Sequence, residues 1–219
     1  MNENYEREYH KTLHGHLYTN PEYYELRAKL AYLNYFKNVK NLKNKKVLEF
    51  GCGLGQNIYW LSKLGVNAKG YDISKFALNF CKEKGLNVTN RIEKEKFDIV
   101  FSRHVLEHLR NPFEELVKMR ELLRNKGILI LILPCEKNER VSSKPDIHRH
   151  LYSWNFRAIN NLLDEAGFRV VENKTLRFAM GYNKLKFTSR ISLKLYDILT
   201  KLVGFARGAR ELKIIVVKK

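Results

Sequence analysis

Cysteine is scarce in this sequence, and its spacing argues against a disulfide framework or a thiolate metal site. Only Cys52, Cys81 and Cys135 occur in 219 residues. An odd number of widely separated thiols matches neither a small secreted scaffold nor a Cys-x-x-Cys zinc site. We therefore expect reduced thiols and a cytoplasmic protein.

Long hydrophobic runs are also missing. No apolar segment reaches the roughly 18 residues that a membrane-spanning helix needs. The first residues read M-N-E-N-Y-E, which is not the apolar region of a signal peptide. We find no internal repeat and no low-complexity linker. A hydrophobic content of 44% is ordinary for a globular protein, so we expect one domain, with additions, around a sizeable core.

Acidic residues are few relative to basic ones. The chain has 41 Lys and Arg against 23 Asp and Glu, a net charge of +18. Residues 174–219 alone hold twelve basic residues and two acids, Asp197 and Glu211. Such an excess favours acidic partners, namely nucleic acid, anionic lipid or phosphorylated small molecules. The alternative explanation is solubility alone.

Strand-like and helix-like segments alternate from residue 46 onward. The apolar patterns predict helices at 21–38, 56–64, 74–84, 112–123 and 153–166, the last with Ser153 as a candidate cap. They predict strands at 46–50, 67–71, 86–89, 97–101, 126–133, 168–172 and 212–217. This alternation is typical of an α/β fold, here a Rossmann-like, seven-stranded, mostly parallel sheet with helices on both faces.

A glycine-rich loop follows the first predicted strand. Residues 47–57 read V-L-E-F-G-C-G-L-G-Q-N, with glycines at every second position. Glycine allows a sharp turn and a close approach of a ligand to the backbone, and a strand that enters such a loop before a helix makes a cofactor cradle. Dinucleotide-binding loops read G-x-G-x-x-G. Here the third glycine comes one residue early, and Glu49 stands two residues before the first.

That loop and four later segments resemble the class I S-adenosylmethionine-dependent methyltransferases. The later segments read G-Y-D-I-S at 70–74, F-D-I-V-F-S-R-H-V-L-E-H at 97–108, L-L-R-N-K-G-I-L-I at 122–130, and H-R-H-L-Y-S at 148–153 with a helix that ends in A-G-F at 166–168. The resemblance spans about residues 46–176. A Rossmann dehydrogenase is the structural alternative, but it does not predict the Leu-Glu-His segment or an antiparallel seventh strand.

The resemblance implies S-adenosyl-L-methionine as the cofactor and assigns residues to it. The glycine backbone would wrap the methionine part, Glu49 would orient the loop or reach the amino group, and Asp72 would bind the ribose hydroxyls. Asn90 replaces the usual acidic residue after the third strand and would face the adenine amino group. The cofactor-binding set that we expect is Glu49, Phe50, Gly51, Cys52, Gly53, Gly55, Asn57, Asp72, Ile73, Asn90, Arg91, Ser102 and Arg103.

Three histidines are candidate catalytic residues. Methyl transfer from an activated sulfonium needs mainly alignment, and a base where the acceptor is a hydroxyl or a protonated amine. His104 is the first candidate for this base, because it follows the fourth strand. His148 and His150 lie after the fifth strand, across the cleft. We expect no metal: His148-x-His150 with Asp146 offers ligand types but not a closed set of four.

Two further segments are expected to choose the acceptor. One is an N-terminal helical cap at 1–44, and the other is a helical insertion at 177–210 within the methyltransferase domain at 45–219. The insertion carries an apolar stripe among basic residues. We favour packing of that stripe on the sheet; an anionic membrane surface bound through 181–207 and, less so, nucleic acid are alternatives.

The resulting hypothesis is a methyltransferase for a small-molecule, glycan or lipid-linked acceptor, with O-methylation favoured. An RNA or protein methyltransferase is one alternative, although no Asn-Pro-Pro-Tyr type motif follows the fourth strand. A non-catalytic protein that binds S-adenosylmethionine or associates with membranes is the other.

Overall fold

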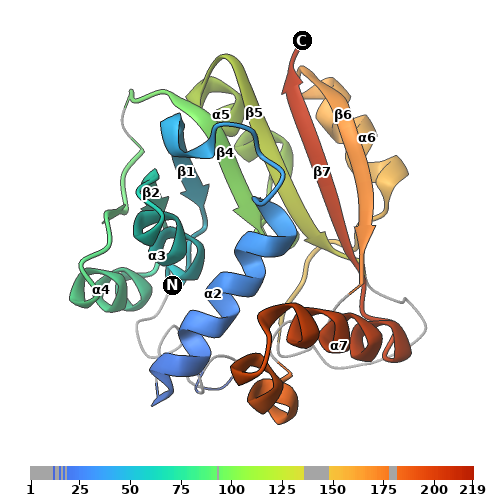
Figure 1. The fold of residues 1–219 in the computed structure, drawn as a ribbon. Coiled ribbons are helices and arrows are strands. Elements are labelled where there is room, and N and C mark those ends of the chain that lie inside the picture. The colour runs from blue at the N-terminus through green and yellow to red at the C-terminus, as the bar shows by residue number, and fades with distance from the viewer. Residues whose placement is uncertain are drawn as a thin grey trace.

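One seven-stranded sheet organises the chain (Figure 1). The structure is a computed structural model, and it describes residues 12, 15, 17, 19–92, 94–135, 148–177 and 182–219. The strand order is β3-β2-β1-β4-β5-β7-β6. The strands are β1 (Lys46–Phe50), β2 (Asn67–Tyr71), β3 (Val88–Thr89), β4 (Phe97–Arg103), β5 (Leu123–Pro134), β6 (Phe168–Leu176) and β7 (Glu211–Lys218).

The directions of the strands confirm the predicted fold class. Strands β1 to β5 pair in parallel, whereas β7 is antiparallel to both β5 and β6. Because β1 and β4 are adjacent and parallel, their carboxyl ends meet at one edge, where an open α/β sheet binds its ligands.

Helices cover both faces of the sheet. The described α-helices are α2 (Pro21–Tyr35), α3 (Gln56–Lys63), α4 (Lys75–Glu83), α5 (Pro112–Leu122), α6 (Phe156–Glu165) and α7 (Leu193–Ala206), and the 3-10 helices are η1 (Leu42–Asn44), η2 (Leu106–His108) and η3 (Asn183–Arg190). Helices α5 and α6 pack on one face, and α2 and α3 on the other (Figure 1).

Strand β5 is buried on both faces, as its unbroken apolar run predicts. Leu129, Leu131 and Leu133 join the core beneath α5 and α6. Ile130 and Ile132 join the core beneath α2 and α3. All five are at most 1% exposed, so each contributes about 1.5–3 kcal/mol of hydrophobic stabilisation.

The predicted element bounds differ from the observed ones by a few residues in several places. Strand β4 extends two residues further, to Arg103, and β5 begins at Leu123, because the paired registers continue that far. Helix α6 begins at Phe156 rather than near Ser153. Its cap is Asn155, whose side chain accepts a hydrogen bond from the backbone N–H of Ala158 at 3.0 Å.

The first predicted helix is present and begins as its sequence indicates. The side chain of Asn20 accepts a hydrogen bond from the N–H of Tyr23 at 2.9 Å, and Pro21 opens α2. The helix ends at Tyr35, three residues before the predicted end. Tyr35 and the following cap residue, Phe36, pack against Phe101 of β4, which fixes α2 over the sheet.

The insertion before β7 is helical but does not pack as we expected. Residues 183–206 form η3 and α7, separated near Ser192, whose side chain caps α7 by accepting from the N–H of Leu195 at 3.3 Å. The buried side of α7 consists of Tyr196, Thr200 and Gly204. The apolar stripe faces outward instead, so the favoured packing of this stripe on the sheet is wrong.

No helix in the described ranges is long and apolar enough to cross a lipid bilayer.

Candidate cofactor and acceptor site

The glycine loop adopts backbone conformations that other residues avoid. Gly51, Gly53 and Gly55 have φ angles of 77°, 50° and 69°, in the left-handed region. A Cβ on Gly51 would lie 2.3 Å from Cγ2 of Val105, and one on Gly55 would lie 2.7 Å from Sγ of Cys81. A Cβ on Gly53 would meet no atom of the described residues within 4 Å, so the middle of the loop faces open space in this part of the structure.

Glu49 lies beneath this loop with one oxygen engaged and one not. Its side chain is 3% exposed, and Oε1 accepts a hydrogen bond from the amide of Asn57, the second residue of α3. Within the described part of the chain, Oε2 has no hydrogen-bond partner. Burial raises the pKa of Glu49 to about 8, against the lowering effects of Asn57 and Arg103. A buried carboxylate oxygen of this kind fits the ammonium group of a methionine moiety.

Asp72 follows β2 and holds two backbone amides. Oδ2 accepts from the N–H of Gly53 at 2.7 Å, and Oδ1 accepts from the N–H of Ser74 at 2.9 Å. The carboxylate therefore ties the glycine loop to the start of α4. Each oxygen keeps a second lone pair, so ribose hydroxyls can bind beside these amides.

Three apolar residues predicted to flank the cofactor occupy different depths. Phe50 is 3% exposed and packs on the ring of Tyr71 in the core, and Cys52 is buried beneath Gly70. Ile73 is 59% exposed. Of the three, only Ile73 presents an apolar side chain at the surface beside Asp72.

The residues after β3 lie in an exposed turn. Asn90 and Arg91 are exposed, and the N–H of Arg91 donates to Oγ1 of Thr89 at 3.1 Å. Asn90 lines a surface hollow with Lys75, at the start of α4, and Val88. Asn90 is therefore an exposed residue beside the first turn of α4.

Ser102 and Arg103 end β4 and point to opposite faces of the sheet. Ser102 is 2% exposed, and its Oγ has no hydrogen-bond partner among the residues described. Arg103 instead donates from an Nη atom to Oε1 of Glu211 at 3.2 Å and lies over the ring of Tyr35. Its side chain therefore belongs to a polar cluster under α2.

That cluster places His104 against a carboxylate from the last strand. Nε2 of His104 lies 2.9 Å from Oε1 of Glu211, and the hydroxyl of Tyr35 donates to Oε2 of Glu211 at 2.8 Å. His104 has a φ angle of 51°, a strained conformation for a residue other than glycine. Burial and the charge of Arg103 lower the pKa of His104, which favours a neutral imidazole.

Glu211 and Arg27 are members of this cluster that the sequence did not reveal. Burial would raise the pKa of Glu211, but Arg103, His104 and Tyr35 outweigh it and lower the value to about 2. Arg27, on α2, has a lowered pKa because it is buried and near Arg103. Its Nε has no hydrogen-bond partner among the described residues. The sequence did not indicate Arg27 because it lies within the apolar pattern that predicts α2. It did not indicate Glu211 because that residue lies 107 residues after His104.

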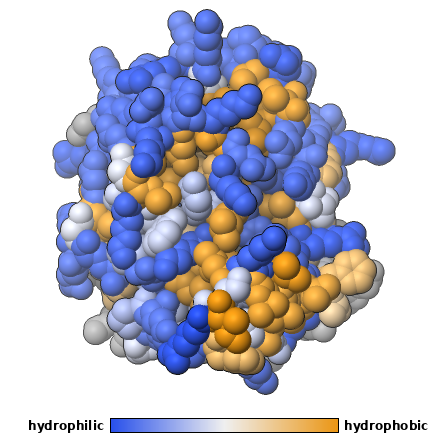
Figure 2. All heavy atoms as spheres, viewed as in Figure 1, coloured by the Kyte–Doolittle hydropathy of each residue, from blue (hydrophilic) through white to orange (hydrophobic). Residues whose placement is uncertain are grey.

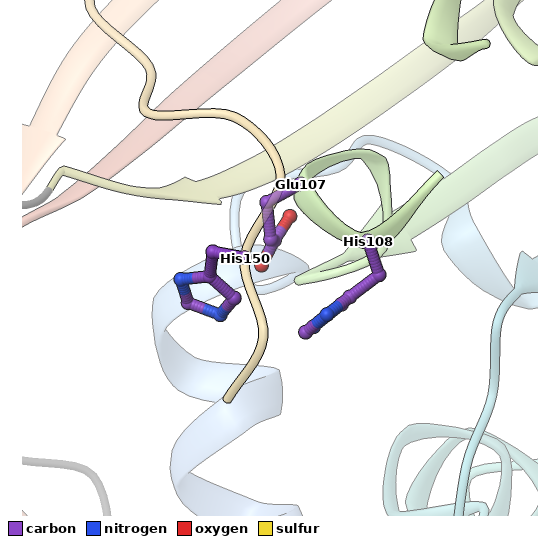
Figure 3. A group of neighbouring side chains, drawn as sticks. All are labelled: Glu107, His108 and His150. Atoms are coloured by element: carbon purple, nitrogen blue, oxygen red, sulfur yellow. The ribbon is translucent and has the colours of Figure 1, made fainter. Parts of the chain in front are cut away.

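The other two candidate histidines follow β5 and lie beside η2, the turn after β4. His148 is exposed and His150 is half-buried, with their ring centres 5.4 Å apart. His150 lies 4.8 Å from the ring of His108, next to Glu107 of η2 (Figure 3). His104 contacts Glu211, and His150 is near enough that its charge also lowers the pKa of His104. Asp146 lies outside the described residues.

This arrangement defines a class of protein: a Rossmann-like α/β fold whose glycine loop, buried acid and strand-end aspartate fit S-adenosylmethionine. Three features support this fit: the open space at Gly53, and the side-chain oxygens of Glu49 and Ser102 that have no hydrogen-bond partner among the described residues. Residues 18–173 match the family described as "Methyltransferase domain". The chain therefore belongs to this family, which confirms the class I S-adenosylmethionine-dependent methyltransferase that the motifs predict.

Individual relatives match parts of the chain. A tRNA U34 carboxymethyltransferase from Pseudoalteromonas atlantica is 37% identical over 109 residues, which cover 43% of this chain and 33% of the relative. A ubiquinone biosynthesis O-methyltransferase from Glaesserella parasuis is 31% identical over 121 residues, 47% of this chain and 50% of the relative. This chain thus spans between a third and a half of these two relatives.

Solved structures share the fold over most of the chain. An S-adenosylmethionine-dependent methyltransferase from Archaeoglobus fulgidus has a TM-score of 0.56 at 21% identity, covering 89% of this chain and 93% of that one. The magnesium protoporphyrin IX methyltransferase from Synechocystis PCC 6803 has a TM-score of 0.58 at 16% identity, covering 89% and 78%.

Proposed function

We propose that this chain transfers a methyl group from S-adenosylmethionine to a hydroxyl of a small-molecule, glycan or lipid-linked acceptor. The observation that carries the proposal is the pairing of His104 with Glu211 at the end of β4, next to the loop at Val105 that contacts Gly51. S-adenosylmethionine would supply an activated methyl group. The chain's own contribution is to bind, to align and to accept a proton.

In this proposal His104 is the base and Glu211 its positioning residue. Nε2 lies 2.9 Å from Oε1 of Glu211, so in this proposal Nδ1 would accept the proton of an acceptor hydroxyl. The lowered pKa of His104 keeps the imidazole neutral near pH 7, as a base requires. Glu49 would hold the ammonium group of the cofactor, and Asp72 its ribose.

The outward stripe on the insertion supports a lipid-linked acceptor. Its five apolar residues are 38–75% exposed: Ile191, Leu195, Ile198, Leu202 and Phe205. Apolar atoms gather over α7 in the lower part of Figure 2. Basic residues of η3 and α7 border the stripe, among them Lys184, Lys186, Lys194 and Lys201. An apolar stripe with a basic border suits the surface of an anionic membrane.

An RNA acceptor is the second candidate, because the chain is similar to a tRNA carboxymethyltransferase and strongly basic. The exposed stripe argues against it, since a nucleic-acid surface would gain nothing from aliphatic side chains. A non-catalytic cofactor-binding protein remains the other alternative.

A label-transfer screen separates these acceptors. The full chain is incubated with methyl-labelled S-adenosylmethionine and with lipid, aqueous and RNA fractions of a cell extract. We expect label in the lipid fraction, in a base-stable ether. Label in RNA would replace the proposal by the second candidate, and no transfer to any fraction despite cofactor binding would favour the non-catalytic alternative.

Vesicle binding tests the membrane part on its own. We expect the chain to sediment with phosphatidylglycerol vesicles and not with phosphatidylcholine vesicles. Leu202→Glu combined with Phe205→Glu should abolish this. Val171→Glu is the matched control, because Val171 is 58% exposed on β6, away from the stripe. Equal sedimentation of the double variant and the wild type would contradict the docking surface.

A further inference from the structure

Two segments that are distant in sequence bring an acid and two imidazoles together beside the cofactor loop. Glu107 and His108 belong to η2 after β4, and His150 comes more than forty residues later, after β5. One ligand atom from each of the three lies within 4.8 Å of the others (Figure 3). We propose that Glu107, His108 and His150 bind a divalent first-row transition ion.

The burial of these residues suits a cation. Glu107 is 0% exposed, while His108 and His150 are half-buried. A carboxylate withdrawn from water is costly unless positive charge or hydrogen-bond donors compensate it. An ion between the carboxylate and the two imidazoles would add positive charge at this buried acid, and the half-buried histidines would leave it reachable from solvent.

The backbone holds the two segments together at this point. The N–H of Leu151 donates to the carbonyl of Glu107 at 2.7 Å, which fixes the position of His150 relative to η2. Arg149, between the histidines, has a φ angle of 51°, so the chain turns through a strained conformation next to the cluster. These backbone contacts hold His150 in a fixed position next to η2.

The donor set indicates which ions fit. Two imidazoles and one carboxylate suit Zn²⁺ and neighbouring first-row ions, whereas all-oxygen sets suit Ca²⁺ and Mg²⁺. Metal–ligand bonds of about 2.0–2.2 Å place the donors of one ion about 3–4 Å apart. The three ligand atoms lie up to 4.8 Å apart, so each would have to move by about an ångström to bind one ion. Rotation of the two half-buried imidazoles can supply this movement. Three protein ligands leave at least one position for water or an acceptor oxygen.

This site could not be predicted from the sequence, because its ligands come from two distant segments. The sequence suggests only His148, His150 and Asp146 as ligands, which do not complete a set. Among the described residues, the fold brings Glu107 and His108 to His150, and it leaves His148 exposed.

Metal titration of the intact chain tests the proposal without any assay of activity. The protein is first dialysed against a chelator, and Zn²⁺ or Co²⁺ is then added while heat and the visible Co²⁺ spectrum are recorded. We expect one saturable equivalent per chain. His108→Ala and His150→Ala should each weaken binding by at least ~10-fold, a loss in the range seen when metal-site residues are changed.

Two further variants make the outcome decisive. His148→Ala removes a neighbouring imidazole outside the three-ligand set and should bind metal like the wild type. Glu107→Gln keeps the shape of the buried side chain and should also weaken binding. The absence of one-to-one binding by the wild type would overturn the proposal, leaving a carboxylate–imidazole hydrogen-bond cluster. So would unchanged affinity in both His108→Ala and His150→Ala.

Discussion

The cofactor side and the acceptor side of the site are built in different ways. On the cofactor side, the glycine loop, Glu49 and Asn57 lie within eleven consecutive residues, and Asp72 reaches Gly53 across two adjacent strands. On the acceptor side, Tyr35 of α2, His104 after β4 and Glu211 of β7 meet from three distant parts of the chain. Local backbone geometry therefore defines the first, and tertiary packing defines the second.

The largest effect that we expect comes from the acceptor side. His104→Gln removes the base, and turnover should fall by about 10²–10⁴-fold, the usual contribution of a general base. Cofactor affinity should change little, because Glu49 and Asp72 remain. In the wild type, turnover should rise with pH and reach half of its maximum below pH ~6.5, since the pKa of His104 is lowered from that value. Unaltered turnover in the variant would remove His104 from the mechanism.

Glu211→Gln should cost the fold about 3 kcal/mol, because it leaves Arg103 without its carboxylate in a largely buried cluster. The pKa of Glu211 is lowered from 4.5 to about 2, so the stability it contributes is present above pH ~4.5 and is lost as the pH falls toward 2. Urea unfolding at pH 7 and at pH 3 measures both effects. A difference between variant and wild type that is the same at both pH values would contradict this pH dependence.

A glycine substitution tests the cofactor side. Gly51→Ala combines a φ angle of 77° with a Cβ 2.3 Å from the side chain of Val105, whereas Gly65→Ala has a similar φ of 75° and no neighbour within 4 Å. Both should lose about 1–2 kcal/mol to backbone strain. Only Gly51→Ala should lose a further ~1–3 kcal/mol to overpacking and fail to bind cofactor. Equal losses of unfolding free energy in the two variants would show that the contact with Val105 does not affect stability.

The smallest effect concerns the tether between the insertion and α2. Arg190 forms an ion pair with Glu22 at 3.2 Å, and both side chains are well exposed, at 71% and 59%. Arg190→Gln should change the free energy of unfolding by less than ~1 kcal/mol, since solvent screens such pairs. A larger loss, measured by urea unfolding, would mean that the insertion is held more by charge than by the packing of Tyr196.

The same contrast explains how much the sequence could predict. The order of strands and helices, the turn at 51–55 and the position of Asp72 at the end of the second strand were predicted, because periodicity, glycine spacing and short motifs are local signals. The sequence could not predict that Glu211 reaches His104, that His150 joins Glu107, or that the stripe at 191–205 faces outward. Each depends on which distant segment the fold brings alongside. A helical pattern shows that a stripe exists, but not what covers it.

Calorimetric titration of the intact chain with S-adenosylmethionine, in two buffers of different ionisation enthalpy at pH 7, tests the cofactor cradle most directly. Glu49 has a pKa of about 8 when free, and an ammonium group beside it would favour its charged form. We predict one equivalent bound, the release of about one proton, and affinity at least ~10-fold lower in Asp72→Ala. No binding by the wild type, or unchanged binding by Asp72→Ala, would contradict the account.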